Sequence, residues 1–179
     1  MIVVLGVLLP GTIFTGLVAY RTAAQSRQVI ERRLLDAARV DADALDREFD
    51  DAIRVLTQLA LSDSLARGDL KTFHEEARRT CDARVGWFQI VLADRSGQQV
   101  LHTGVEYGTA LEPAVDQASL QQLFQTGRPT VGNQITGTRL RRPGFALRVP
   151  VRRSGEIIYA LTAVVDPASL QRLIVSQLP

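Results

Sequence analysis

The sequence predicts an α+β protein, with an N-terminal transmembrane helix, a long helix, and an antiparallel sheet of about five strands with helices on one side. Three observations lead to this expectation. The chain opens with an uncharged apolar run, residues 22–66 contain neither proline nor glycine, and residues 87–165 alternate strand-length apolar segments with glycine-containing turns. Strands that follow one another through short turns pair antiparallel. The 179 residues are 46% hydrophobic and 22% charged, an ordinary globular composition that excludes fibrous and fully disordered chains.

Residues 1–21 are predicted to form a membrane anchor. Residues 2–20 carry no charge, and as a helix these 19 residues would span about 29 Å, close to the thickness of the hydrocarbon core. Two alternatives are open. A cleaved signal peptide would need a small-residue cleavage site, for which Thr22–Ala24 is a weak candidate. A buried core helix is disfavoured because the run has no polar face.

Residues 22–82 are predicted to be helical and to support the rest of the domain. Within a helix over 22–66, apolar side chains recur at steps of three and four, the pattern of a heptad seam. The members of this seam are Ala42, Leu45, Phe49, Ala52, Leu56 and Leu59. The seam serves either a homodimer through the 42–59 helix or packing of the helix on its own domain, and the sequence leaves both open. A second helix, 70–81, follows the break at Gly68-Asp69.

Residues 83–179 are predicted to hold the sheet. Asp94–Gly97 and Ser154-Gly155 suit tight turns, because Asp and Ser bond to nearby backbone and Gly accepts a positive φ. Asp166 before Pro167 is typical of a helix start. In chain order the predicted elements are strands 87–93 and 98–103, a loop over 105–113, a helix over 116–126, a strand over 130–136, strands 145–152 and 157–165, and a helix from residue 166.

The stretch Gly86–Leu101 (GWFQIVLADRSGQQVL) resembles the first hairpin of Cache domains, and Val164–Leu170 is similar to the strand-to-helix exit of the same family. Cache domains are the extracytoplasmic, PAS-like sensors of bacterial histidine kinases, chemoreceptors and diguanylate cyclases. The resemblance implies that residues 83–179 form a sensory core in the periplasm, held by a single-pass anchor in the inner membrane. It also implies that a small-molecule signal passes to a cytoplasmic output outside this chain. The aromatic–Arg–Trp–Tyr signature of the amino-acid-binding subgroup is not found.

The charge distribution conflicts with this topology. Arginines at positions 21, 27, 32, 33 and 39 follow the apolar run. The positive-inside rule, applied by itself, would place the segment after the anchor in the cytoplasm. A basic stretch ahead of Met1 would remove the conflict.

The sequence shows no pattern typical of an active site, a metal site or a cofactor site. His74 and His102 lie 28 positions apart, and Arg78 stands where the second histidine of a zinc-binding helix would be. Glycine-rich phosphate loops and the protein-kinase motifs are missing from the sequence. A net charge of +2 is too small for a dedicated nucleic-acid binder. We therefore expect no catalysis, metal, cofactor or nucleic-acid partner, and we expect Cys81 to be a small buried residue.

A cluster of six arginines over residues 139–153 marks the candidate ligand site. Arg148 stands out because its strand neighbours Leu147 and Val149 are apolar. A guanidinium on the sheet face would bind a carboxylate through two parallel hydrogen bonds, which suits an organic acid. The alternative is a surface arginine, or one paired with an acid such as Glu156.

Four other residues complete the predicted ligand-binding set. Trp87 and Gln89 are expected to share one strand face and to line one cavity, although a tryptophan is more often part of a core. Tyr107, in the loop after the first hairpin, is expected to cover the pocket. Arg139 lies in a basic turn that would close over an anion, and its alternative is a solvated loop residue.

These features favour a membrane-anchored module that binds a small ligand and relays the signal by shifting the packing of its helices. An anchored dimerisation or scaffold module without ligand sensing is the alternative. A third possibility is a soluble binding domain released by cleavage near Ala24.

Overall fold

A computed structural model of the chain describes residues 45–136 and 142–169. The chain divides into two compact units, Met1–Asp43 and Ala44–Pro179, and the described residues all belong to the second. The predicted anchor over residues 1–21 and the predicted site residue Arg139 therefore lie outside the described residues. Within the described ranges, no helix combines the length and the apolar character that crossing a membrane requires.

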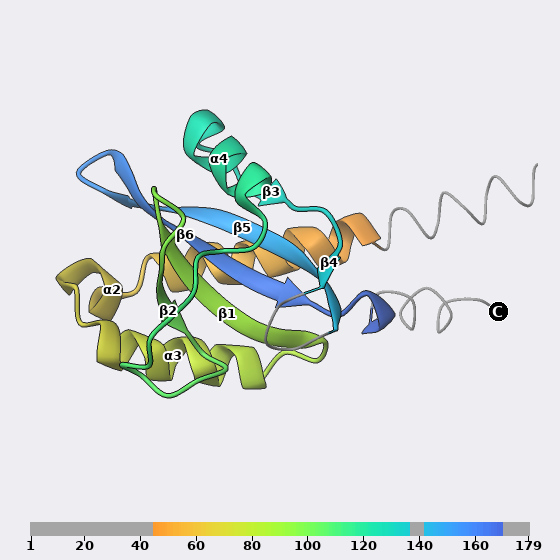
Figure 1. Ribbon diagram of the computed structural model, residues 1–179, viewed down its shortest axis with the longest axis horizontal. Coiled ribbons are helices and arrows are strands. Elements are labelled where there is room, and N and C mark those ends of the chain that lie inside the picture. Colours follow the sequence, from red (N-terminus) through yellow and green to blue (C-terminus); the bar gives the residue numbers. More distant parts are fainter. Residues whose placement is uncertain (1–44, 137–141, 170–179) are drawn as a thin grey trace, which may run out of the picture. The chain divides into compact units, whose positions relative to one another are not determined.

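The described strands form one antiparallel sheet in the order β2-β1-β6-β5-β3, with β4 paired to a separate part of β5. Hairpins β1–β2 and β5–β6 meet where β1 pairs with β6 in the middle of the sheet (Figure 1). The predicted antiparallel sheet is thus confirmed. The strands are β1 (Trp87–Asp94), β2 (Gln99–His102), β3 (Thr130–Val131), β4 (Ile135–Thr136), β5 (Pro143–Arg153) and β6 (Glu156–Val165).

Short turns close both predicted hairpins. In the β1–β2 turn, the Asp94 carboxylate accepts hydrogen bonds from the backbone N–H groups of Ser96 and Gln98 at 2.9 and 3.0 Å. In the β5–β6 turn, Ser154 and Gly155 have φ of 51° and 88°, as in the two-residue turns that match the twist of a hairpin. These local interactions close both turns, and each strand pair shifts its register close to its turn, at Leu92/Ala93 and at Val151/Arg152.

The predicted strand over 130–136 is interrupted. Its two parts, β3 and β4, both pair with β5, but their registers differ by one residue. The interruption includes Gly132, whose N–H donates to the carbonyl of Ala146 at 2.7 Å. A Cβ on Gly132 would collide with the carboxylate of Asp116. The strand therefore breaks where a side chain from a distant segment packs against its backbone.

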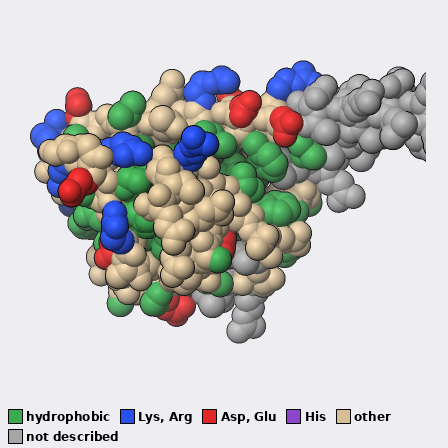
Figure 2. Space-filling model, turned by 90° about the horizontal axis from the view of Figure 1, so that it is seen from above, with side chains coloured by type: hydrophobic (Ala, Val, Ile, Leu, Met, Phe, Trp, Pro, Cys, Tyr) green, Lys and Arg blue, Asp and Glu red, His purple; other side chains and the backbone are tan. Residues whose placement is uncertain are grey.

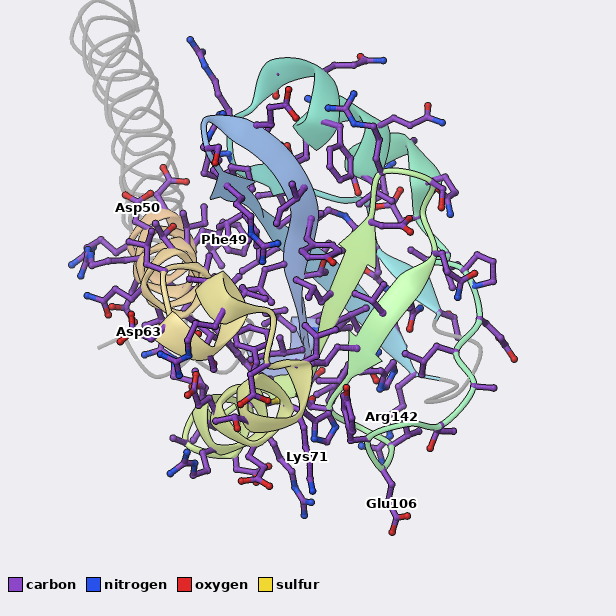
Figure 3. All side chains as sticks on the ribbon, turned by 90° about the vertical axis from the view of Figure 1, so that its left-hand side faces the viewer. Phe49, Asp50, Asp63, Lys71, Glu106 and Arg142 are labelled. Carbon is purple, nitrogen blue, oxygen red and sulfur yellow. The ribbon has the colours of Figure 1, made fainter. Side chains whose placement is uncertain are left out.

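One face of the sheet packs against helices. These are a helix described over residues 45–60, α2 (Asp63–Arg67) and α3 (Leu70–Asp82) (Figures 1 and 3). Apolar side chains of these helices and of alternate strand positions form the larger core. Its members include Ala52, Leu56, Leu59, Leu65, Phe73, Ala77, Trp87, Ile90, Leu92, Leu101, Leu147, Val149, Val151, Leu161, Ala163 and Val165.

The expectation of one helix running to residue 66 is wrong at its C-terminal end. The helix stops at residue 60, and the chain turns through Leu61 and Ser62 before α2. Ser62 is extended, and its hydroxyl accepts a hydrogen bond from the N–H of Leu65 at 3.3 Å. A serine side chain that caps the next helix thus breaks a segment that contains no proline or glycine.

The described part of the predicted seam from Phe49 onward packs on its own domain, whereas Ala42 lies outside the described residues. Ala52, Leu56 and Leu59 are buried in the larger core, and Phe49 packs against it. Phe49 points toward the sheet, whereas Asp50 points away from it (Figure 3). The described seam residues from Phe49 onward are covered by their own sheet, which favours packing within the domain, and the homodimer through this seam stays a prediction.

The opposite face of the sheet carries α4 (Gln117–Thr126) and the loop before it (Figure 3). Leu120 and Leu123 of α4 join Ala93, Ala114 and Ala160 in a smaller core. The expectation that helices cover one side of the sheet is therefore wrong, since helices lie on both faces. A layer of polar groups lies beside this smaller core.

Candidate functional site

Arg148 occupies the middle of β5 and faces α4. Successive strand residues point to opposite faces, so Leu147 and Val149 enter the larger core while Arg148 lies on the other side. The residue is 3% exposed, so the alternative of a surface arginine is wrong. A guanidinium buried to this extent requires partners for its N–H groups.

The Arg148 guanidinium connects β5 to β6 and to the start of α4. Its Nε donates to the Ser119 hydroxyl at 2.8 Å, and its Nη1 donates to the Thr162 hydroxyl at 2.7 Å. Its Nη2 donates to the backbone carbonyl of Asp116 at 3.1 Å. Burial lowers the pKa of Arg148, and the nearby Asp116 carboxylate opposes that shift.

Asp116 is the acidic partner of Arg148. Its Oδ2 lies 3.8 Å from Nη2 of Arg148, and the two side chains are 7% and 4% exposed. The same carboxylate caps α4, because it accepts hydrogen bonds from the N–H and the hydroxyl of Ser119. Glu156, the partner suggested by the sequence, is exposed at the start of β6, so that expectation is wrong.

A cavity of about 60 Å³ adjoins this network between the sheet and the segment that leads into α4. Alanine and valine side chains form much of its wall. The polar residues that line it are Gln89, Gln99, Asp116, Arg142, Arg148 and Thr162. Gln89 and Arg148 are thus brought together, as the sequence predicts. Arg142 is exposed, whereas Arg148 is buried.

Trp87 lies on the other face of the sheet. Trp87 pairs with Val165 and Gln89 pairs with Val164, so β1 has an extra residue, Phe88, relative to β6. This bulge reverses the alternation of side chains, which places Trp87 in the larger core and Gln89 at the cavity. The expectation that Trp87 and Gln89 share a face is therefore wrong.

Tyr107 lies at a second cavity of about 160 Å³, beside α3 and β2. Its ring centroid is 5.9 Å from that of His74. His74 also lines this cavity, and its Nε2 contacts the carbonyl oxygens of His102 and Val105 at 3.2 and 3.0 Å. Because a carbonyl cannot donate, His74 carries a proton on Nε2. Tyr107 does not line the Arg148 cavity, so its predicted role as a cover for that pocket has no support in the geometry.

Cys81 is buried, as predicted, and burial raises the pKa of its thiol to about 11. Among the described residues, no group of three or more His, Cys, Asp or Glu side chains is arranged to hold a metal ion. On the face shown in Figure 2, Lys and Arg side chains are spread among acidic and apolar ones rather than gathered into one patch.

Sequence reasoning missed Asp116, Ser119, Thr162 and Gln99, whereas Arg142 belongs to the arginine cluster that the sequence marks as the candidate site. Asp116 carries a local signal, because Asp is a favoured N-cap residue and stands directly before a predicted helix. The same pattern identifies the start of α4 but says nothing about which strand residue the cap contacts. Thr162 lies within an apolar strand, and no local sequence pattern there indicates that its hydroxyl would contact Arg148.

Several solved structures have a similar fold. They include the ligand-binding domain of the Campylobacter jejuni chemoreceptor Tlp3 in complex with 4-methylisoleucine (TM-score 0.56, 14% identity), the sensor domain of the V. cholerae histidine kinase DctB (0.63, 12%) and the E. coli DcuS sensor domain (0.57, 16%). The matches cover 80%, 82% and 74% of this chain. They cover 61%, 60% and 98% of those chains, so the chain spans about three fifths of the first two.

No family model and no curated protein matches the chain. The likeness to solved structures therefore rests on the arrangement of helices and strands. That arrangement is a Cache, or PAS-like, fold, which this chain shares with ligand-binding and sensor domains of chemoreceptors and histidine kinases.

Proposed function

We propose that this chain is the ligand-binding module of a membrane-anchored bacterial receptor and that its ligand is a small organic acid. The observation that carries the proposal is the cavity beside Arg148, which combines apolar walls with converging polar groups. The fold supports it, because similar structures include ligand-binding domains of chemoreceptors.

The charges at the cavity favour an anion. Arg142 and Arg148 line it together with a single carboxylate, that of Asp116, among the described residues. Arginine binds carboxylates through a planar fork of N–H donors and stays charged at physiological pH. A cavity of about 60 Å³ suits a ligand of a few heavy atoms, with its alkyl part against the alanine and valine walls.

We further propose that residues 1–21 anchor the module, that the sheet domain is periplasmic, and that the helix over 45–60 carries the signal to a cytoplasmic kinase, cyclase or chemotaxis output. The larger core supports this route, because it joins that helix to the sheet face opposite the cavity. A ligand that changes the strand positions at the cavity would bias how this helix packs.

A thermal unfolding assay tests the proposed ligand class. The full chain, kept in mild detergent because of its apolar start, has one tryptophan, Trp87, which is buried and reports unfolding by fluorescence. At least one short organic acid is expected to raise the unfolding midpoint, since a ligand at 100 times its Kd stabilises the folded state by about 2.7 kcal/mol. Replacing the exposed Arg142 by glutamine should reduce that rise severalfold.

The matched control is Arg78→Gln. Arg78 is an exposed arginine on α3, which packs on the opposite face of the sheet, so this variant should respond to the acid as the natural chain does. If no acid, amine or nucleobase raises the midpoint, the module does not sense a small ligand through this pocket and a scaffold role takes its place.

A further inference from the structure

The Asp116 carboxylate has two partners that compete for its position. Its Oδ1 accepts from the N–H of Ser119 at 3.3 Å and its Oδ2 accepts from the Ser119 hydroxyl, which caps α4. The same Oδ2 is 3.8 Å from Nη2 of Arg148. Direct bonds between a guanidinium and a carboxylate measure about 2.7–2.9 Å and often come in pairs. The Asp116 carboxylate therefore neutralises Arg148 without accepting a direct hydrogen bond from its guanidinium.

We infer that Asp116 is an internal competitor for the ligand: a ligand carboxylate binds Arg148 directly only when the Asp116 side chain moves away. The inference rests on the proposed function and deepens it. The cavity is lined by both residues, so an anion placed next to Arg148 would also lie next to Asp116. Two carboxylates at one buried site repel each other, and the ligand must displace the resident one.

Displacement of Asp116 would change the start of α4 and the β3–β4 edge. The cap on α4 is lost when the carboxylate leaves the N–H of Ser119. A Cβ at Gly132 would collide with the Asp116 carboxylate, so this carboxylate packs directly against the backbone between β3 and β4. Asp116 thereby links the occupancy of the cavity to the position of a helix and of an edge strand.

The test is the affinity of the full chain for acetate, with sodium chloride at equal ionic strength as the reference. In Asp116→Asn the side chain keeps its shape and still caps a helix, but the competing charge is gone. We expect the Kd for acetate to fall at least tenfold relative to the natural chain. The affinity is read from acetate-observed NMR and from the thermal midpoint reported by Trp87.

Asp69→Asn is the matched control. Asp69 caps α3 as Asp116 caps α4, because it accepts from the N–H and the hydroxyl of Thr72. Asp69 is exposed and α3 packs on the other face of the sheet, so its variant should leave acetate binding unchanged. In the double variant Asp116→Asn, Arg148→Met, the gain in acetate affinity should disappear.

The possible results separate this inference from the proposed function. Equal acetate affinity in the natural chain and Asp116→Asn would retain the organic-acid pocket but overturn the competition. Weaker binding by Asp116→Asn would make Asp116 a ligand contact, which also overturns it. Binding to neither chain would count against both ideas, whereas binding to Asp116→Asn alone supports the competition. If Asp116→Asn fails to fold in chloride, acetate should restore folding, and no restoration would overturn the inference.

Discussion

Replacing Arg148 by methionine is expected to lower the free energy of unfolding by about 3–5 kcal/mol, the range found when one partner of a buried ion pair is removed. Asp116 would be left as a buried carboxylate without its counter-charge. The hydroxyls of Ser119 and Thr162 and the carbonyl of Asp116 would each lose an N–H donor. The measurement is urea unfolding of the full chain in detergent, followed by the fluorescence of Trp87.

Two variants make the Arg148 experiment specific. Arg152→Met removes an exposed arginine from the same strand, one that donates to the carbonyls of Gly127 and Gly155, and should cost less than about 1 kcal/mol. Adding Asp116→Asn to Arg148→Met should recover much of the lost stability, because the unpaired charge is removed. A loss below about 1 kcal/mol for Arg148→Met would mean that the guanidinium is not the link between the sheet and α4.

The hairpins could be predicted from the sequence because their causes are local. Asp94, Ser154 and Gly155 act within a few residues of their own positions. The strands on either side of these turns are clearly more apolar than the turns themselves. The start of α3 is similar, since Asp69 caps the helix that begins one residue later. Such elements depend little on the rest of the molecule, so the sequence pattern is sufficient.

The candidate site could be predicted only in part, because its geometry depends on distant contacts. Arg148 was identifiable as a charged residue between apolar neighbours, but its partner Asp116 lies 32 positions earlier in the chain. The extra residue at Phe88 moves Trp87 to the other face of the sheet. A strict alternation along β1 contains no sign of such a bulge.

The seam in the long helix shows a second limit on what the sequence can predict. Apolar residues at steps of three and four indicate that one side of a helix is covered, but they do not say what covers it. In the structure the sheet of the same domain covers Ala52, Leu56 and Leu59. The identity of the covering surface depends on which residues the fold brings opposite the helix, and single-helix periodicity contains no information about them.

Leu56→Ala tests this packing directly and should cost about 2–5 kcal/mol, the range for truncating a fully buried leucine. Leu56 is 0% exposed in the larger core, whereas Leu61, just beyond the end of the same helix, is 77% exposed. Leu61→Ala should therefore change the free energy of unfolding by less than about 0.5 kcal/mol. Both values come from urea unfolding of the full chain, measured over a hundredfold range of protein concentration.

The concentration series separates the two explanations of the seam. If Leu56 packs within its own domain, the unfolding midpoint of the natural chain is independent of protein concentration and the loss in Leu56→Ala is the same at every concentration. If the seam instead joins two chains, mass action raises the midpoint as the protein is concentrated, and Leu56→Ala removes that dependence. The second result would contradict the burial of Leu56 against its own sheet, and with it the route from the cavity to the helix over 45–60.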